Sequence, residues 1–158
     1  MTGTIGSPSE PEAWDDWAAD VGRHVADGFS HLDLLTAVDR VRTGEIEVVI
    51  HLQRRTAEGA LEDAWGRTLL ARQAPVLPSV VAVLPSAGWH EREIAEMFGV
   101  EVDGHPDLQP LLLHGADGPP PLLKDTPLVA RVETPWPGQA EGARAKTPGV
   151  PPEWRDAT

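Results

Sequence analysis

Alternating hydrophobic and polar residues predict strands in the first half of the chain. The clearest run covers 45–52, where every second side chain is Ile, Val or Leu and the residues between them include Glu47 and His51. This pattern predicts a strand with one dry face. It places His51 on the wetter face, where we expect a solvated histidine rather than a metal ligand.

A second strand is predicted a few residues earlier, over 31–39. Its period of two places Leu32, Leu34 and Val38 on one face and Asp39 on the other. The two runs are close enough along the chain to form an antiparallel pair.

Hydrophobic residues at helical spacing predict one helix before these strands and another after them. The first is expected to begin at Ser9, with Glu12 completing a capping box, and to end at Gly28 after burying two Trp rings. The second is expected to begin at a Ser86 cap and to end at Gly99.

The second predicted helix has two different faces when it is turned at 3.6 residues per turn. The face expected to pack on the body carries His90, Ile94, Met97 and Phe98. The opposite, charged face carries Trp89, Arg92, Glu93 and Glu96. On helical geometry alone, a solvated amphipathic surface helix explains this pattern.

The proline distribution divides the chain into a body and an arm. Nine of the sixteen prolines follow Gly118, and they disfavour long helices and central strands there. We expect a disordered N-terminus over 1–8, an α+β body over 9–100, an extended interface arm over 101–132 and a flexible Pro/Gly-rich tail over 133–158. The predicted fold class is α+β, with an N-terminal helix, a small antiparallel sheet with short helices packed on it, and a Pro-rich C-terminal arm.

Composition argues against several classes of function. The chain has 13 basic and 25 acidic residues, a net charge of −12, so nucleic acid and anionic lipid are not expected partners. It has no Cys, which removes disulfides, CxxC redox motifs and Cys-ligated iron–sulfur clusters. No apolar run is long enough for membrane insertion, and the first twenty residues are too acidic for a secretory signal, so the cytoplasm is the expected compartment.

Three short motifs in the second half carry the most specific signal. The first comprises Glu91, Arg92, Glu93, Glu96 and Gly99. The second comprises Gly104, His105, Pro106, Asp107 and Leu108. The third comprises Pro121, Leu122, Lys124 and Asp125. In this order and spacing they resemble the thirty-kilodalton (C) subunit of the proton-pumping NADH:quinone oxidoreductase, respiratory complex I, whose fold unit is shared with related membrane-bound nickel–iron hydrogenases.

The resemblance extends over roughly residues 10 to 130. It favours a third strand over 65–71, where the spacing of residues alone is also compatible with a helix. Residues 56–63, just before this segment, are expected to form a loop.

The resemblance implies a cofactor-free subunit of the peripheral arm that scaffolds the electron-transfer module. Its implied chief partner is the subunit related to the hydrogenase large subunit, which lines the quinone site. NADH, FMN, iron–sulfur clusters and quinone are expected in partner subunits. The implied location is the cytoplasmic side of the plasma membrane, peripheral and held through the complex.

No catalytic, cofactor-binding or metal-binding residues are expected in this chain, which therefore acts in an enzyme without performing the chemistry itself. His90 and Glu91 begin an HExxH-like pattern, but position 94 is Ile, so the zinc interpretation fails. The signature residues are instead expected to form hydrogen-bonded ion pairs at an interface. They are Glu91, Arg92, Glu93, Glu96, Gly99, Gly104, His105, Pro106, Asp107, Lys124 and Asp125.

Three expected basic residues are missing. Gln109 and Pro110 follow the second motif, and Leu123 precedes Lys124, at positions where the family usually has cations. Two alternatives therefore stay open: the equivalent subunit of a membrane-bound hydrogenase or other complex I-like assembly, and an acidic adaptor domain without a redox role.

Overall fold

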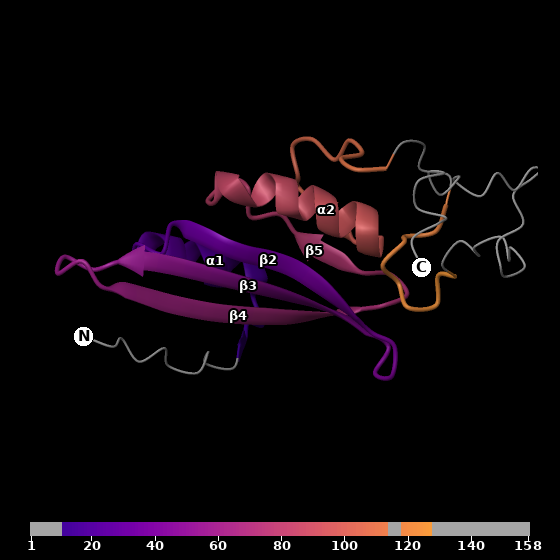
Figure 1. The fold of residues 1–158 in the computed structure, drawn as a ribbon, viewed down its shortest axis with the longest axis horizontal. Helices are drawn as coiled ribbons and strands as arrows, with labels where there is room; N and C mark the ends of the chain where they lie inside the picture. Colours follow the sequence, from indigo (N-terminus) through magenta and orange to yellow (C-terminus); the bar gives the residue numbers. More distant parts are fainter. Residues whose placement is uncertain (1–10, 114–117, 128–158) are drawn as a thin grey trace, which may run out of the picture. The chain divides into compact units, whose positions relative to one another are not determined.

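The computed structural model describes residues 11–113 and 118–127, which form an α+β unit with one four-stranded and one two-stranded sheet. Figure 1 shows the long strands side by side, with α2 running along the sheet next to β2. The predicted fold class is confirmed. The elements in chain order are β1 (Glu12–Ala13), α1 (Trp17–Ala26), β2 (His31–Arg40), β3 (Glu45–Arg55), β4 (Leu61–Ala71), β5 (Val76–Pro78), a 3-10 turn (Pro85–Ala87), α2 (Gly88–Phe98) and β6 (Glu101–Asp103).

The segments predicted as a disordered N-terminus (1–8) and a flexible tail (133–158) lie outside the described residues, as do 114–117 and 128–132 of the predicted arm. Neither helix of the described residues has the length and apolar composition needed to cross a bilayer.

Strand β3 is the centre of the larger sheet, because β2 and β4 both pair with it in antiparallel register. Its alternation is confirmed, since one face is completely buried and consists of Ile46, Val48, Ile50 and Leu52. Both helices add side chains to this core, including Val21 of α1 and Ile94 of α2. The third strand, favoured by the resemblance, is also confirmed, but it begins at Leu61, inside the segment expected to be a loop.

The predicted faces of β2 are wrong beyond its first residues. The pairing with β3 shifts register between Leu32 and Leu34, and this bulge changes which side chains point inward. As a result Asp39 is buried, whereas Val38 is 38% exposed. The simple period of two assumed an uninterrupted strand, and no residue type in this segment marks a bulge.

The first helix begins later than predicted. Glu12 lies in β1, which pairs in parallel with β4, and the helix is capped by Asp16, whose side chain accepts a hydrogen bond from the Ala19 N–H at 3.3 Å. Trp14 and Trp17 are both buried, as expected, but Trp14 reaches the core from an extended segment. The capping-box interpretation of Glu12 is therefore wrong.

The second helix ends as predicted and begins differently. Gly99 adopts the left-handed conformation (φ 69°) that terminates α2. A 3-10 turn replaces the expected Ser86 cap, and α2 has no capping hydrogen bond from a side chain. The predicted packed face is confirmed for Ile94, Met97 and Phe98, which are buried, whereas His90 is only partly buried. Glu91 is also buried, which was not predicted.

The short parallel sheet of β5 and β6 was not predicted. The chain leaves β5 at Pro78, passes through α2 and returns in β6, which pairs with β5 through Leu77 and Val102. Three-residue strands are too short to show periodicity, so the sequence carries no clear signal for them.

Gly66 provides a test of the packing between β1 and β4. A Cβ atom at this position would lie 2.3 Å from the Trp14 ring, so we expect Gly66→Ala to lower the free energy of unfolding by about 1–3 kcal/mol through overpacking. Urea denaturation measures the change. The control is Gly22→Ala in α1, where a Cβ meets no neighbouring atom within 4 Å and added helix propensity should stabilise by up to about 1 kcal/mol. Equal effects of the two substitutions would contradict this packing.

Candidate functional site

The three sequence motifs meet around helix α2. The second motif begins beside the first turn of α2, where His105 contacts Gly88. The following residues pass Arg92 and then Glu96. The third motif lies at the other end, where the Leu122 N–H donates to the Met97 carbonyl. The motifs thus attach the chain's own second half to one helix.

Glu91 is the buried member of the first motif. Its side chain is fully inaccessible and accepts hydrogen bonds from the Ser79 hydroxyl and the Val80 N–H, both at 2.7 Å. Burial raises the pKa of Glu91, against the opposing effect of these two donors. Glu91 therefore ties α2 to the loop that follows β5.

His105 turns inward and completes this buried group. Its Nδ1 accepts the Asp107 N–H at 2.9 Å, so the ring proton resides on Nε2, which donates to the Gly88 carbonyl at 3.1 Å. The same Nε2 lies 4.0 Å from Glu91. The second motif is thereby a turn locked onto the start of α2.

Arg92 and Glu96 hold residues 109–113 against the outer face of α2. The Arg92 guanidinium donates to the carbonyls of Gln109 and Pro110, at 2.9 and 3.0 Å. Glu96 accepts the N–H groups of the next three residues, at 2.8–3.3 Å. Partial burial raises the pKa of Glu96 and these three donors lower it, and the donors prevail. Because the Arg92 acceptors are backbone atoms, the missing basic side chains at 109 and 110 do not affect this attachment.

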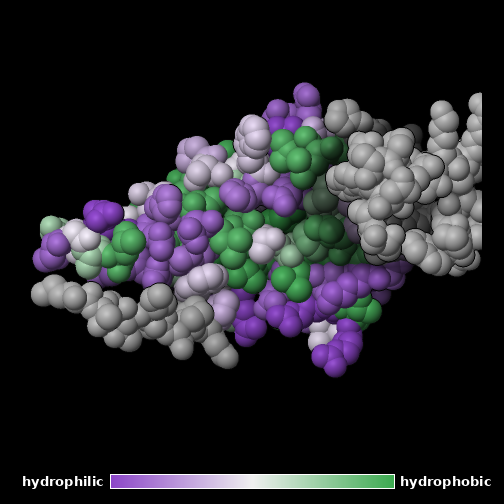
Figure 2. Space-filling view, viewed as in Figure 1, coloured by the Kyte–Doolittle hydropathy of each residue, from purple (hydrophilic) through white to green (hydrophobic). Residues whose placement is uncertain are grey.

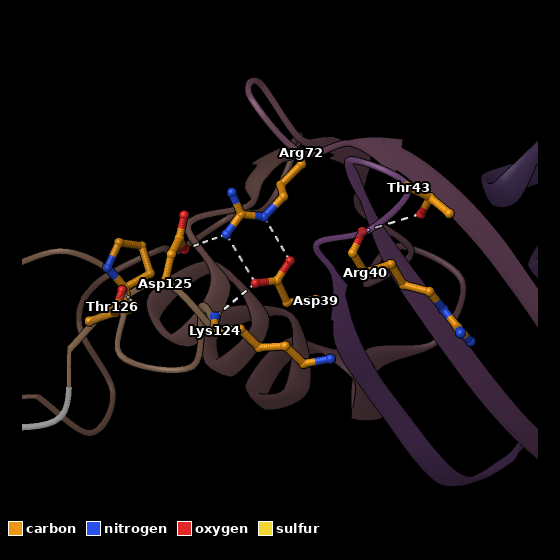
Figure 3. A network of polar contacts seen from close by, with 8 residues as sticks. Asp39, Arg40, Thr43, Arg72, Lys124, Asp125 and Thr126 are labelled. Carbon is orange, nitrogen blue, oxygen red and sulfur yellow. Dashed lines mark hydrogen bonds and ion pairs between the residues drawn. The ribbon is translucent and has the colours of Figure 1, made fainter.

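Asp39 binds the third motif to the sheet, as Figure 3 shows. Its carboxylate receives two hydrogen bonds from Arg72, at 2.7 and 3.1 Å, and a third from the backbone N–H of Lys124 at 2.8 Å. Asp125 pairs with the same Arg72. The hydrogen bonds from Arg72 are the main reason that the pKa of Asp39 is lowered. Lys124 therefore contributes its backbone here, and its ammonium group is left to face outward.

Leu123 occupies the third position at which a basic residue was expected. Its side chain is partly buried and packs against the hydrophobic core. An apolar side chain therefore anchors the third motif at the position where the resemblance predicted a basic one.

The expectation of a solvated His51 is wrong. The side chain is buried, stacks on Trp65 with ring centroids 4.0 Å apart, and lies between Asp33 and Asp63 at 2.8 and 3.1 Å. The hydrogen bonds from Gln53 and then from His51 lower the pKa of Asp63. The sequence contains all of these residues, but only the strand register brings them together.

Some motif side chains remain on the surface. Glu93 is exposed, and Trp89, one turn before it, is 72% exposed. Such a large aromatic side chain in water is a typical anchor for a protein partner. Within the described residues, no group of three or more His, Asp or Glu side chains is arranged to hold a metal ion.

Comparison with known proteins gives a consistent family. Residues 9–132 match the family described as the respiratory-chain NADH dehydrogenase, 30 Kd subunit. The chain is 39% identical over 112 residues to the C subunit of NADH-quinone oxidoreductase from Ruegeria sp., covering 66% of this chain and 51% of that protein. It is 42% identical over 106 residues to the C/D subunit of the same enzyme from Methylococcus capsulatus, covering 61% of this chain and 17% of that protein. The chain thus spans about half the length of the Ruegeria protein and a smaller part of the Methylococcus one.

Two solved structures are similar. A trypsin-resistant fragment of Nqo5 has 27% identity and a TM-score of 0.51, covering 57% of this chain and 74% of that one. A chain of the membrane-bound sulfane sulfur reductase, an archaeal respiratory membrane complex, has 23% identity and a TM-score of 0.67, covering 89% of this chain and 86% of that one. At that identity, the second likeness shows a shared fold alone.

The Asp39–Arg72 pair predicts a specific acid sensitivity. The folded-state pKa of Asp39 is lowered from 3.8, so its stabilisation is complete above about pH 5 and is lost as the pH falls through the folded-state value. We expect Asp39→Asn to lower the free energy of unfolding at pH 7 by about 2–4 kcal/mol and to flatten its decline below about pH 4. Urea denaturation from pH 7 to pH 3 measures both effects. The exposed Asp15→Asn is the control, and a decline equally steep in both variants would rule out this role.

The contribution of Glu91 to the free energy of unfolding should change with pH in the opposite direction to that of Asp39. Its folded-state pKa is raised above 4.5, so ionisation at higher pH opposes folding. We expect Glu91→Gln to change the free energy of unfolding at pH 7 by less than about 1 kcal/mol, whereas Glu91→Ala should lower it by about 2 kcal/mol or more because the donors of Ser79 and Val80 lose their acceptor. Relative to wild type, the Gln variant should gain stability from pH 4 to pH 7 in thermal or urea unfolding. Equal damage by both substitutions would contradict this account.

Proposed function

The chain belongs to the family of the respiratory-chain NADH dehydrogenase 30 Kd subunit, and from this we propose that it is a cofactor-free scaffold subunit in the peripheral arm of a proton-pumping NADH:quinone oxidoreductase. The observation that carries the proposal is the family match over residues 9–132, which contains all three motifs. In this role the chain supports electron transfer from NADH to quinone by holding the cluster and quinone module in a fixed arrangement.

The site geometry supports a scaffold because its polar groups serve to shape the chain. Glu91, Glu96 and Asp39 each accept several hydrogen bonds from backbone or side-chain donors of the same chain. A carboxylate occupied in this way is poorly placed for acid–base chemistry on a substrate. Its effect is to fix the outline of the α2 face before a partner binds, which reduces the entropy lost on association.

The partner we propose is the subunit related to the hydrogenase large subunit that lines the quinone site. Trp89 and Glu93 lie on the outer face of α2 and are well placed to meet it. NADH, FMN, iron–sulfur clusters and quinone would bind in partner subunits. The complex would hold this chain peripherally on the cytoplasmic side of the membrane.

A second candidate keeps the fold and changes the assembly. Three positions that are expected to be basic in the family carry Gln109, Pro110 and Leu123 instead. This difference supports a second candidate assembly, a membrane-bound hydrogenase or another complex I-like complex. The same scaffold role would then serve a different electron donor.

Affinity capture from detergent-solubilised native membranes tests the proposal. We expect the tagged chain to recover flavin- and NADH-binding subunits together with antiporter-like membrane proteins. Recovery of a nickel-hydrogenase large subunit without the NADH module would select the second candidate, and recovery of no redox partner would overturn both. Trp89→Ala should reduce capture about tenfold or more because it removes the large exposed aromatic side chain proposed to meet the partner. The control is Leu61→Ala, which truncates another exposed apolar residue, at the start of β4, and should leave capture unchanged.

A further inference from the structure

The chain carries a basic corner although its net charge is −12. Four of the nine Lys and Arg residues in the described segments gather where the β2–β3 turn meets the end of β4 and the third motif, and a fifth, Arg67 within β4, joins them through Glu47, which also binds Arg40. We call this group the basic corner; it consists of Arg40, Arg42, Arg67, Arg72 and Lys124. The β2–β3 turn projects from the sheet at the lower right of Figure 1. On the face seen in Figure 2, this turn carries mainly hydrophilic residues.

The acidic partners of this corner lie beneath its cations. Glu47 is 4% exposed at its side chain and accepts hydrogen bonds from Arg40 and Arg67, which are 49% and 44% exposed. Asp39 is completely covered and is bound to Arg72. These two carboxylates are therefore inside, whereas the outer edges of the Arg40 and Arg67 guanidinium groups meet water. In the described part of the chain, the one exposed acidic partner of the corner is Asp125, which pairs with Arg72. The surface that a partner encounters is more positive than the sum of charges suggests.

A hollow of about 230 Å³ opens in the basic corner. It is lined by Arg40, Arg42 and Lys124 and by the aliphatic side chains of Val38 and Val41, which are 38% and 45% exposed. Figure 3 shows the Lys124 side chain extending from the backbone N–H that binds Asp39.

The acidic groups near the hollow pair with Arg40 and Arg72 and leave two cations of the hollow, Arg42 and Lys124, available. Asp39 also lines the hollow, but its carboxylate is buried and its oxygens are occupied by Arg72 and the Lys124 N–H. Asp125 is likewise paired with Arg72, and Glu45 lies nearby at the start of β3. Within the described residues, Arg42 and Lys124 form no ion pair with a carboxylate.

We propose that the basic corner binds an acidic segment of a partner subunit, and this rests on the proposed function. The segment would place carboxylates against Arg42, Arg40 and Lys124 and an apolar side chain between Val38 and Val41. Arg favours bidentate contact with a carboxylate, and the two valines favour a protein segment over a purely ionic ligand.

The charge of the whole chain selects a short protein segment over larger polyanions. An anionic membrane or a nucleic acid extends over many Debye lengths, each about 8–10 Å at physiological salt, and would meet the net repulsion of the acidic chain. A short acidic segment meets the local field of the basic corner alone. Its association should therefore be fast at low salt and weaken as salt rises.

Affinity capture tests the inference, with tagged wild-type and charge-reversed chains as baits. The membranes are solubilised from a strain that lacks this subunit. Arg42→Glu combined with Lys124→Glu should weaken capture of the redox partners at least about tenfold at low salt and reduce its salt dependence. Arg23→Glu combined with Arg55→Glu makes the same change in net charge away from the basic corner and should stay within about threefold of wild type. Thermal unfolding of all chains verifies that each variant is folded.

Cross-linking identifies the occupant directly. Because the chain has no Cys, Arg42→Cys and the control Arg55→Cys each introduce a single thiol for a short photoactivatable cross-linker. We expect the thiol at position 42 to give a partner peptide rich in Asp and Glu. A lipid adduct or a peptide without acidic residues overturns the inference, as does equal capture by the two charge-reversed pairs while wild type still recovers redox subunits. If wild type recovers no redox subunit, the proposed function fails instead.

Discussion

The buried carboxylate of Asp39 joins three parts of the chain that are distant in sequence. It lies at the end of β2, binds Arg72 just after β4 and receives the backbone N–H of Lys124 from the third motif. A carboxylate removed from water requires such partners, because an unpaired buried charge is strongly unfavourable. This requirement connects the sheet to the segment beyond α2.

Helix α2 is held by a second group of contacts that follows the same principle. Glu91 secures its inner side to the loop after β5, and Arg92 and Glu96 secure residues 109–113 to its outer side. On the face predicted to be solvated, Arg92 and Glu96 thus bind the chain's own backbone, whereas Glu93 stays exposed. A surface built in this way is rigid before it meets a partner, as a scaffold in a large assembly requires.

Prediction from the sequence succeeded where one physical signal acted over a long segment. The strand of alternating aliphatic residues in β3 and the left-handed Gly99 stop of α2 depend on local chemistry and were found correctly. The inward turn of Asp39 and the buried setting of His51 were missed because they depend on a bulge and on pairing across strands. Glu91 was identified as a motif residue, but its burial depends on Ser79 and Val80 reaching it from another element.

The sequence by itself determined the fold class, strands β2 and β3, the end of α2 and, through three spaced motifs, the family, whose resemblance in turn favoured β4. These properties depend on neighbouring residues or on short sequence patterns, which can be recognised without the tertiary structure. The tertiary structure alone decided which carboxylates are buried, which cations face water at the basic corner and which backbone donors satisfy the acidic motif. The physical reason is that burial and hydrogen-bond partnership are properties of residues brought together by strand register and helix packing, over separations as large as that between Asp39 and Lys124.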